Sequence, residues 1–415
     1  MQSSAGTNRI SWPPNFRLNA LRSTDLTFQP FNPLRYLRFV PEQYDVIVVG
    51  LGAMGSAACY HLARRGREVL GIDRFAPPHT MGSSHGQTRI IREAYFEHPI
   101  YVPLVQHAYE LWAELERESG RRLFVQTGGL MIGPPDGIVV GGAKKSAEEH
   151  GLPHDTLSAA EVRRRFPALQ PTDDMVAVWE PRAGILFPET CVETHLTLAR
   201  RHGAEIHLNE TVARWETNES LARVVTSQGI YQASRLLLAS GSWITTLLPE
   251  LKLPFTVERQ VLYWFEAKRA PENFRPERCP IYLWEHEPER FFYGFPDLGE
   301  GVKVAGHHEG RIVSPDAIDR AVHADEPEAM RAVLRKFMPD ADGALRSAVV
   351  CMYTNTPDHH FFIDAHPRCP QVLVASPCSG HGFKFSSALG SVLADLLTEG
   401  KTQFDLSLFR YRWPV

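Results

Sequence analysis

The sequence predicts a mixed α/β fold that begins with a β-α-β dinucleotide-binding unit. A β-branched apolar run, a glycine-rich turn, a helical pattern and a second short strand follow one another between residues 44 and 73. Further along the chain, helical patterns alternate with strand-like segments. The chain has 415 residues, 43% of them hydrophobic, which is enough for two ordinary domains or one large two-layer enzyme body.

The predicted nucleotide-binding unit opens with a strand at residues 44–49. The glycines that follow have the spacing G-x-G-x-x-G and are Gly50, Gly52 and Gly55. Such glycines let a turn approach a pyrophosphate, and the next helix, expected over residues 56–65, offers it unpaired N–H groups. Asp73 ends a second strand, expected over residues 68–72, at the position where an acid binds ribose hydroxyls. Because strand, helix and acid agree, we predict a bound dinucleotide rather than a purely architectural turn.

Later segments favour FAD over NAD as that dinucleotide. A strand that ends in small residues is expected at residues 233–243, after a hairpin-like stretch at residues 211–231. Flavoproteins often return to the nucleotide domain through such a strand, although any buried strand with a glycine end has the same pattern. Periodicity predicts further helices over residues 102–119, 191–202, 327–337 and 386–399.

Composition and charge exclude several classes of function. A net charge of −4 leaves no basic excess for binding nucleic acid, so no nucleic-acid partner is expected. No stretch reaches the roughly 20 apolar residues of a membrane span, so we expect no membrane segment. The six cysteines are scattered without C-x-x-C spacing. This argues against a disulfide framework and a thiolate zinc site, and favours a reducing, cytoplasmic location.

Residues 1–43 differ from the rest of the chain. They contain five arginines against two acidic residues, and five prolines that prevent a long helix. An arginine-rich, acid-poor segment also resembles an organellar transit peptide, but the prolines spoil an amphipathic helix. We therefore predict a disordered extension or a start codon assigned too early, with a targeting signal as the alternative.

Four segments combine polar groups with glycine or aromatic residues: 82–92, 301–308, 351–358 and 379–387. Through them, and above all through Cys351-Met-Tyr-Thr and Ser379-Gly-His-Gly-Phe-Lys, the chain from Tyr44 onwards resembles the monomeric sarcosine oxidases and the related N-methyltryptophan and pipecolate oxidases. The resemblance implies a Rossmann-type FAD-binding domain interleaved with an antiparallel-sheet substrate domain. The implied segments are 44–123, 189–255 and 358–415 for FAD, and 124–188 and 256–357 for substrate and catalysis.

The resemblance also implies how the cofactor is held. Cys351 matches the cysteine that forms a thioether to the flavin, although a small buried hydrophobe is the ordinary role of such a residue. His85, Thr88 and Arg89 belong to a segment that runs along the flavin in the family, where cationic groups favour the anionic reduced ring. The implied cofactor-binding set consists of Gly50, Gly52, Gly55, Asp73, Thr88, Cys351, Gly380 and Gly382.

Catalytic roles follow from the same resemblance. Lys303 lies in a strand-like segment, where a solvated, outward-facing lysine is ordinary, but it matches the family's oxygen-activating lysine. A fixed cation there would stabilise the charge that develops on O2. Arg92 and Lys384 match the pair that holds the substrate carboxylate, a guanidinium fork with a point charge. The implied catalytic set consists of Lys303, His307, Arg89, His85, Tyr293 and Tyr353.

The implied reaction is oxidation of the C–N bond of a small secondary amino acid by O2, carried out by a monomer and releasing hydrogen peroxide. Sarcosine is the first candidate substrate. The segment Glu93–His98 departs from the more glycine-containing loop of the sarcosine and N-methyltryptophan enzymes, so N-methyltryptophan, pipecolate and proline remain alternatives. An FAD-dependent dehydrogenase with another electron acceptor and a non-catalytic nucleotide-binding protein of the same fold also remain.

Two histidine-rich stretches are candidate metal ligands: His307-His308 and Asp358-His359-His360. Adjacent side chains of a strand point to opposite faces, so the first pair is not expected to share one metal ion. We therefore predict no metal site.

Overall fold

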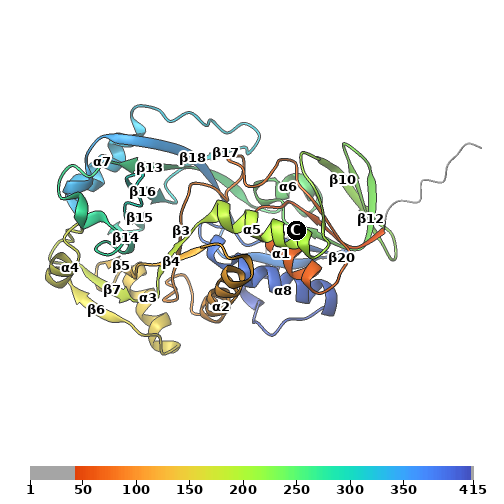
Figure 1. Ribbon diagram of the computed structural model, residues 1–415, viewed down its shortest axis with the longest axis horizontal. Coiled ribbons are helices and arrows are strands. Elements are labelled where there is room, and N and C mark those ends of the chain that lie inside the picture. The colour runs from red at the N-terminus through yellow and green to blue at the C-terminus, as the bar shows by residue number, and fades with distance from the viewer. Residues whose placement is uncertain (1–42, 413–415) are drawn as a thin grey trace, which may run out of the picture. The chain divides into compact units, whose positions relative to one another are not determined.

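The computed structural model of the protein describes residues 43–412 (Figure 1). The extension predicted over residues 1–43 lies outside this range, apart from Gln43, which begins the first strand. Within the described range, no helix combines the length and apolarity needed to span a membrane.

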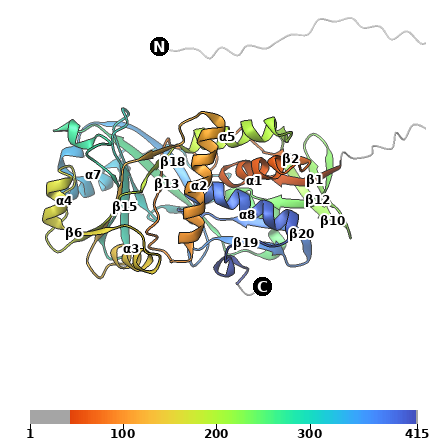
Figure 2. The same cartoon turned by 60° about the horizontal axis from the view of Figure 1, so that its bottom comes forward.

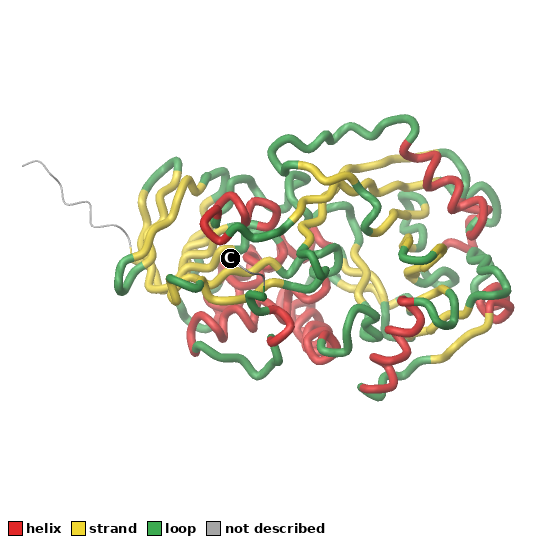
Figure 3. The backbone as a smooth tube through the Cα atoms, turned by 180° about the vertical axis from the view of Figure 1, so that it is seen from behind, coloured by secondary structure: helices red, strands yellow, loops and turns green. Residues whose placement is uncertain are grey.

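Two large β-sheets and a set of helices make up the described chain, which confirms the predicted mixed α/β fold. Seen from behind, the strands gather in two groups (Figure 3). The helices are α1 (Ala53–Arg64), α2 (Tyr101–Ser119), α3 (Ile138–Glu149), α4 (Ala159–Arg165), α5 (Pro188–Arg201), α6 (Ile244–Leu247), α7 (Glu326–Phe337) and α8 (Ser386–Glu399). All the helices expected from periodicity are present. α1 and α5 differ most, since each begins three residues earlier than predicted, α1 directly after Gly52 and α5 at Pro188.

The first sheet has a parallel centre. Its strands are β1 (Gln43–Val49), β2 (Val69–Ile72), β9 (Glu205–His207), β10 (Val212–Thr217), β11 (Ala222–Thr226), β12 (Ile230–Leu238), β19 (Phe362–His366) and β20 (Cys369–Ser376). β1 pairs in parallel with β2 on one side and β12 on the other, and β20 continues the parallel set beyond β12. β10, β11 and β19 add antiparallel pairs at the margins.

Both faces of this parallel centre are buried. Val46 and Val48 of β1 join a core formed with α1, α5 and α8, while Ile47 and Val49 join a second core on the other face. Burial on both faces explains why β1 is a continuous apolar run rather than an alternating one. α1 packs against α5 and α8, and all three lie together in both cartoon views (Figures 1 and 2).

The second sheet is largely antiparallel. Its strands are β5 (Gly129–Gly133), β6 (Asp155–Ser158), β7 (Val176–Glu180), β13 (Thr256–Phe265), β14 (Ile281–Glu287), β15 (Arg290–Phe295), β16 (Val302–His307), β17 (Arg311–Val313) and β18 (Leu345–Asn355). The long pair β13–β18 and the run β16–β15–β14 form its centre. Met330, Leu334 and Phe337 of α7 pack into the core on one face of this sheet.

The chain passes between the two sheets several times. The first sheet takes its strands from residues 43–72, 205–238 and 362–376, and the second from residues 129–180, 256–313 and 345–355. A small third sheet is formed by β3 (Arg89–Ile91), β8 (Gly184–Leu186) and β4 (Phe124–Gln126). In it β8 pairs with both β3 and β4, which belong to segments before and after the predicted boundary at residue 123. β3 thereby brings the segment around Arg89 and Arg92 beside the second sheet.

Candidate active site

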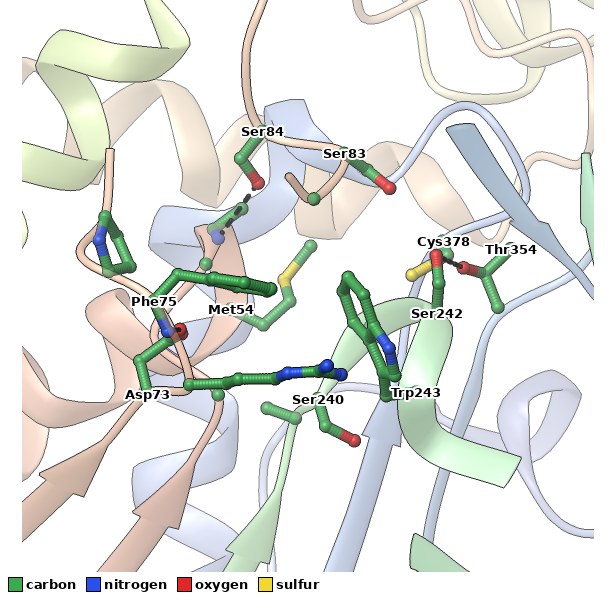
Figure 4. Close-up of a pocket in the computed structure, with 18 of the residues that line it drawn as sticks. Met54, Asp73, Phe75, Ser83, Ser84, Ser240, Ser242, Trp243, Thr354 and Cys378 are labelled. Atoms are coloured by element: carbon green, nitrogen blue, oxygen red, sulfur yellow. Dashed lines mark hydrogen bonds between the residues drawn. The ribbon is translucent and has the colours of Figure 1, made fainter. Parts of the chain in front are cut away.

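A cavity of about 280 Å³ lies beside the carboxyl end of β1. Figure 4 shows Asp73 and Phe75 on one side of it and Ser242, Thr354 and Cys378 on the other. Open parallel sheets bind ligands outside the carboxyl ends of their strands, where the connections of neighbouring strands diverge. The cavity therefore lies where the sequence predicts a dinucleotide.

The turn after β1 depends on two of its glycines. Gly50 has φ +90, and a Cβ atom there would lie 2.6 Å from the carbonyl oxygen of Ala239. A Cβ atom on Gly55 would lie 1.7 Å from the carbonyl oxygen of Gly50, because α1 crosses so close to the turn. Gly52 is different, since only Ser84 Oγ would lie near an added Cβ, at 3.5 Å. Gly50 and Gly55 are therefore required by the packing of the turn itself, whereas Gly52 lines the cavity without a side chain.

Asp73 is held in place by two backbone hydrogen bonds. Its Oδ2 accepts from the N–H of Leu51 and its Oδ1 from the N–H of Phe75, both at 2.7 Å. The carboxylate lines the cavity at the end of β2, where it can accept ribose hydroxyls.

The rim of this cavity contains residues that the sequence reasoning missed. The Arg74 guanidinium lies over the rings of Phe75 and Trp243, at 5.3 and 5.7 Å from their centroids. Asp316 accepts from Arg74 at 2.7 Å and from the Trp243 indole at 2.9 Å. Asp316 is 242 residues from Arg74 in the chain, so no local pattern could have paired them.

The residues around the cavity fit FAD. The N-cap of α1, Gly52, has no side chain to accept from the first N–H groups of the helix; the N–H of Ala53 donates to Ser84 Oγ at 3.2 Å, and a helix N-terminus of this kind suits a phosphate. Ser240 Oγ and both ring nitrogens of His85 are buried without a hydrogen-bond partner among the described residues. Burial lowers the pKa of His85 to about 4, so the ring is neutral and can both donate and accept.

Arg89 contacts two of the predicted cofactor-binding residues, Thr88 and Cys351. Its Nη2 lies 3.7 Å from Cys351 Sγ and donates to the carbonyl of Ser83 at 2.8 Å, while its Nη1 donates to the carbonyl of Thr88. Cys351 itself is buried on β18. The predicted flavin-attachment residue thus has a half-buried guanidinium beside its sulfur.

Lys303 is buried, not solvated. It is 2% exposed on β16, and its Nζ donates to the carbonyls of Gly86 and Thr88 and to Thr88 Oγ1, at 2.6 to 2.9 Å. The rings of Phe295 and Trp264 lie 4.6 and 5.3 Å from Nζ. Burial and the charge of Arg89 lower the pKa of Lys303, while three acceptors satisfy all three N–H bonds of its charged form.

A second cavity, of about 70 Å³, adjoins the first. Its lining includes seven predicted site residues: Arg89, Arg92, Tyr293, His307, Tyr353, Gly380 and Lys384. Arg89, Tyr353, Gly380 and Phe383 line both cavities. His85, Thr88, Lys303 and Cys351 are absent from this second lining. His85 and Thr88 precede Arg89 in the chain, Lys303 donates to Thr88, and Cys351 Sγ lies 3.7 Å from Arg89 Nη2.

Arg92, which is predicted to bind the substrate carboxylate, already binds the carboxylate of Glu97. Its Nη2 donates to both oxygens of Glu97 at 2.8 and 2.7 Å, and the two side chains are 3% and 12% exposed. Burial raises the pKa of Glu97, but the charges of Arg92, His381 and Lys384 outweigh it and the net direction is downward. Glu97 is therefore an ionised carboxylate inside the second cavity, and it was missed although it lies only five residues after Arg92.

Lys384 has no carboxylate partner among residues 43–412. Its Nζ donates to the carbonyl of His381 at 2.7 Å and to the Tyr95 hydroxyl at 3.3 Å. Burial, followed by the charge of Arg92, lowers the pKa of Lys384 to about 7. Near neutral pH this lysine is therefore poised to take up a proton when an anion binds beside it.

His307 and Tyr353 form another part of the same wall. His307 Nδ1 lies 3.3 Å from the Tyr353 hydroxyl. A Cβ atom on Gly380, whose φ is +76, would lie within 2.9 Å of both side chains. Burial and the neighbouring His308 hold the pKa of His307 well below its usual value, so the imidazole is neutral.

The expectation that His307 and His308 point to opposite faces is wrong. Their ring centroids are 4.1 Å apart, because β16 ends at His307 and His308 takes a left-handed conformation with φ +61. The alternation of a strand holds only while the backbone stays extended. Among the described residues, no group of three or more histidine, cysteine or acidic side chains is arranged to hold a metal ion.

Comparison with known proteins points to one family. The family model described as FAD dependent oxidoreductase matches residues 45–396. The monomeric sarcosine oxidase of Streptomyces avermitilis is 47% identical over 370 residues, which are 88% of this chain and 96% of that protein. An N-methyl-L-tryptophan oxidase of Yersinia pestis is 35% identical over 368 residues, 88% of this chain and 98% of that protein.

Among solved structures, L-proline dehydrogenase from P. horikoshii has the same fold, with a TM-score of 0.77 at 22% identity over 89% of this chain and 97% of that chain. The family match covers most of the described residues, and the relatives are similar along nearly their whole length. The chain therefore belongs to the FAD-dependent oxidoreductase family, in the group that contains the monomeric sarcosine oxidases and the N-methyl-L-tryptophan oxidases.

Proposed function

We propose that the protein is a flavoprotein oxidase that holds FAD covalently through Cys351 and oxidises the C–N bond of a secondary amino acid, with O2 as acceptor and hydrogen peroxide as product. The observation that carries this proposal is the pair of buried cations, Arg92 and Lys384, in a small cavity that adjoins the nucleotide cavity. A site of this kind suits a small anion next to a flavin. Sarcosine is the first candidate substrate.

The substrate carboxylate would be held by Arg92 and Lys384. Arg92 offers a guanidinium fork and Lys384 a point charge that is strengthened by proton uptake. Because Glu97 already neutralises Arg92, an incoming carboxylate must displace or share that partner. Lys384 has no such competitor among the described side chains.

The amine of the substrate must lose a proton before it can be oxidised. His307 is the candidate acceptor, because it is neutral, lines the second cavity and is hydrogen-bonded to Tyr353. When bound, FAD would accept a hydride equivalent from the C–H bond beside the nitrogen and pass the electrons to O2. Gly50, Gly52 and Asp73 line the first cavity and would bind the dinucleotide part of FAD, and Gly55 would let α1 pack against the turn.

Two features support the oxidase chemistry and the covalent link. Arg89 Nη2 lies 3.7 Å from Cys351 Sγ, so a flavin attached at that sulfur would have a guanidinium charge beside it. Lys303 supplies a fixed, buried charge near Arg89, because both side chains donate to the carbonyl of Thr88. Acid-precipitated protein should stay yellow, and Cys351→Ser should release the colour into the supernatant.

The wider assignments are proposals too. We propose that the first sheet with α1, α5 and α8 is the FAD-binding domain and the second sheet the substrate domain, with the segment boundaries given above. A cytoplasmic monomer is supported by six free cysteines and by the name of the sarcosine oxidase relatives.

A panel of amines, scored by peroxide release and O2 consumption, tests the function. N-methyl and cyclic amino acids with a carboxylate should be oxidised, and simple methylamines should not, since Lys384 would then remain buried without a carboxylate beside it. Arg92→Ala should raise the apparent KM for every carboxylate substrate and leave FAD bound. Arg223→Ala, which removes an exposed ion pair with Glu216, is the matched control and should change nothing.

The function is wrong if methylamine is oxidised as efficiently as sarcosine and Arg92→Ala affects neither. Reduction of the flavin without O2 consumption would identify a dehydrogenase instead.

A further inference from the structure

We infer that Phe96 and Phe291 form a rigid aromatic gate that limits the site to the smallest N-methyl amino acids, those without a bulky group on the α-carbon. This inference rests on the proposed function and names its substrate class. Phe96 lies in the segment Glu93–His98, which is expected from the sequence to differ from the loop of the sarcosine and N-methyltryptophan oxidases.

The size of the second cavity sets the limit. Its volume is about 70 Å³. At about 10–15 Å³ of such volume for each water-sized group, it has room for about six non-hydrogen atoms, which is the size of sarcosine. A larger amino acid needs space that a protein side chain now fills.

Phe96 fills the space next to the carboxylate-binding cation. The Arg92 guanidinium lies between two aromatic rings, 4.2 Å from the centroid of Tyr95 and 4.8 Å from that of Phe96. Phe96 also lines the cavity. The α-carbon of an amino acid is bonded directly to the carboxylate carbon, so a substituent there would meet the Phe96 ring.

Phe291 closes the gap from the second sheet. It lies on β15, with its ring centroid 6.3 Å from that of Phe96 and 6.5 Å from that of His307. Both distances lie within the range of aromatic contact. Both phenylalanines are half-buried; Phe96 lines the second cavity, and Phe291 lies beside Phe96 without lining that cavity itself.

The segment that carries Phe96 cannot easily withdraw. Its backbone lies against Gly142 of α3, where an added Cβ would be 2.3 Å from the Phe96 carbonyl oxygen. Ser146 Oγ donates to the carbonyl of Tyr95 at 2.5 Å. Before it, the Glu180 carboxylate accepts from the N–H groups of Glu93 and Ala94 at 2.6 and 2.8 Å. A gate anchored on both sides selects by size rather than by adapting to the substrate.

The opposite role for the same rings is to stack on a large substrate side chain. That role needs an open slot beside Phe96, whereas Phe291 occupies the neighbouring space. Stacking therefore predicts that N-methyl-L-phenylalanine is the better substrate, and the gate predicts that sarcosine is.

The decisive experiment removes an aromatic side chain from the protein and adds an aromatic group to the α-substituent of the substrate. Initial rates give kcat/KM for sarcosine and N-methyl-L-phenylalanine in the wild type, Phe96→Ala, Phe291→Ala and the control Phe166→Ala. Phe166 is a half-buried aromatic that packs on Trp179, away from both cavities. The wild type and the control should prefer sarcosine. Phe96→Ala should shift the ratio towards N-methyl-L-phenylalanine by at least about tenfold, and Phe291→Ala in the same direction, as expected when a steric clash in an apolar pocket is relieved.

Ligand binding tests the inference even where a variant binds its substrate in a position that does not allow turnover. The dissociation constants of acetate and phenylacetate, followed by flavin absorbance, should show the same shift in selectivity. An unchanged ratio in both measurements overturns the gate, as does a wild type that prefers N-methyl-L-phenylalanine. A wild type that oxidises neither compound contradicts the proposed function itself.

Discussion

Buried cations dominate the site at the scale of single residues. Arg89, Lys303 and Lys384 are largely or fully enclosed, and none has a carboxylate in ion-pair contact within residues 43–412. Burying a charge without a counter-charge is costly, so such groups are retained where an anion binds or negative charge develops. Under the proposed function, these would be the substrate carboxylate and the charge that develops on O2.

Lys303 should serve the oxygen half of the reaction. Lys303→Met keeps most of the aliphatic stem but removes the charge. Flavin reduction by the amine should persist, while reoxidation slows by about two orders of magnitude, as loss of a roughly 3 kcal/mol electrostatic contribution would produce. Stopped-flow absorbance separates the two steps, with Lys336→Met on the exposed face of α7 as the control. Equal reoxidation rates in the two variants would exclude this role.

Lys384 should make anion binding depend on pH. With its pKa at about 7 in the free protein, it is charged below that pH and must take up a proton on binding an anion above it. The dissociation constant of acetate should therefore be constant below about pH 7 and rise by up to tenfold per pH unit above it. Lys384→Met should bind acetate more weakly, with no such rise. A wild-type profile that matches the variant would show that this lysine does not contact the carboxylate.

At the scale of elements, the strand–turn–helix at the start of the described chain is the most constrained feature. α1 passes so close to the turn that Gly55 can carry no side chain. Gly55→Ala should lower the free energy of unfolding by about 3 kcal/mol or more, at the upper end of overpacking, and reduce FAD content. Gly141→Ala is the matched helical control on α3, because nothing lies within 4 Å of an added Cβ there.

Thermal unfolding and flavin absorbance measure both variants. Gly141→Ala should retain FAD and be as stable as the wild type or more stable by up to about 1 kcal/mol. If Gly55→Ala behaves like this control, the close approach of α1 to the turn is not what fixes the cofactor site.

What the sequence predicted well is what local spacing determines. The strand of apolar residues before Gly50, the acid at Asp73 and the periodicity of the later helices each depend on neighbours within a few turns or one β-α-β unit. The short-range failures have local causes as well: the left-handed backbone at His308 ended the alternation assumed for β16. The ion-pair partner of Arg92 was harder to predict from the sequence. The loop that places Glu97 against Arg92 is held by Glu180 and by α3, which are distant in the chain.

At the scale of the whole molecule, the site exists because the chain passes repeatedly between two sheets. The glycine turn belongs to the first sheet, whereas Lys303, His307 and Cys351 come from β16 and β18 of the second. Arg89 and Arg92 lie in or just after β3 of the small connecting sheet. Contacts such as Arg74 with Asp316 span 242 residues, so single-sequence patterns identified the parts of the site without giving their assembly.

One measurement tests the central claim, that this arrangement is a covalent-FAD oxidase of a small secondary amino acid. Purified yellow protein is mixed with sarcosine without oxygen, its flavin absorbance is followed, and oxygen is then admitted while peroxide is measured. The account predicts that sarcosine bleaches the flavin, that oxygen restores the colour and that about one peroxide appears for each flavin reoxidised. A flavin that sarcosine and every other secondary amino acid leave oxidised, or one that is bleached but not reoxidised by oxygen, would contradict it.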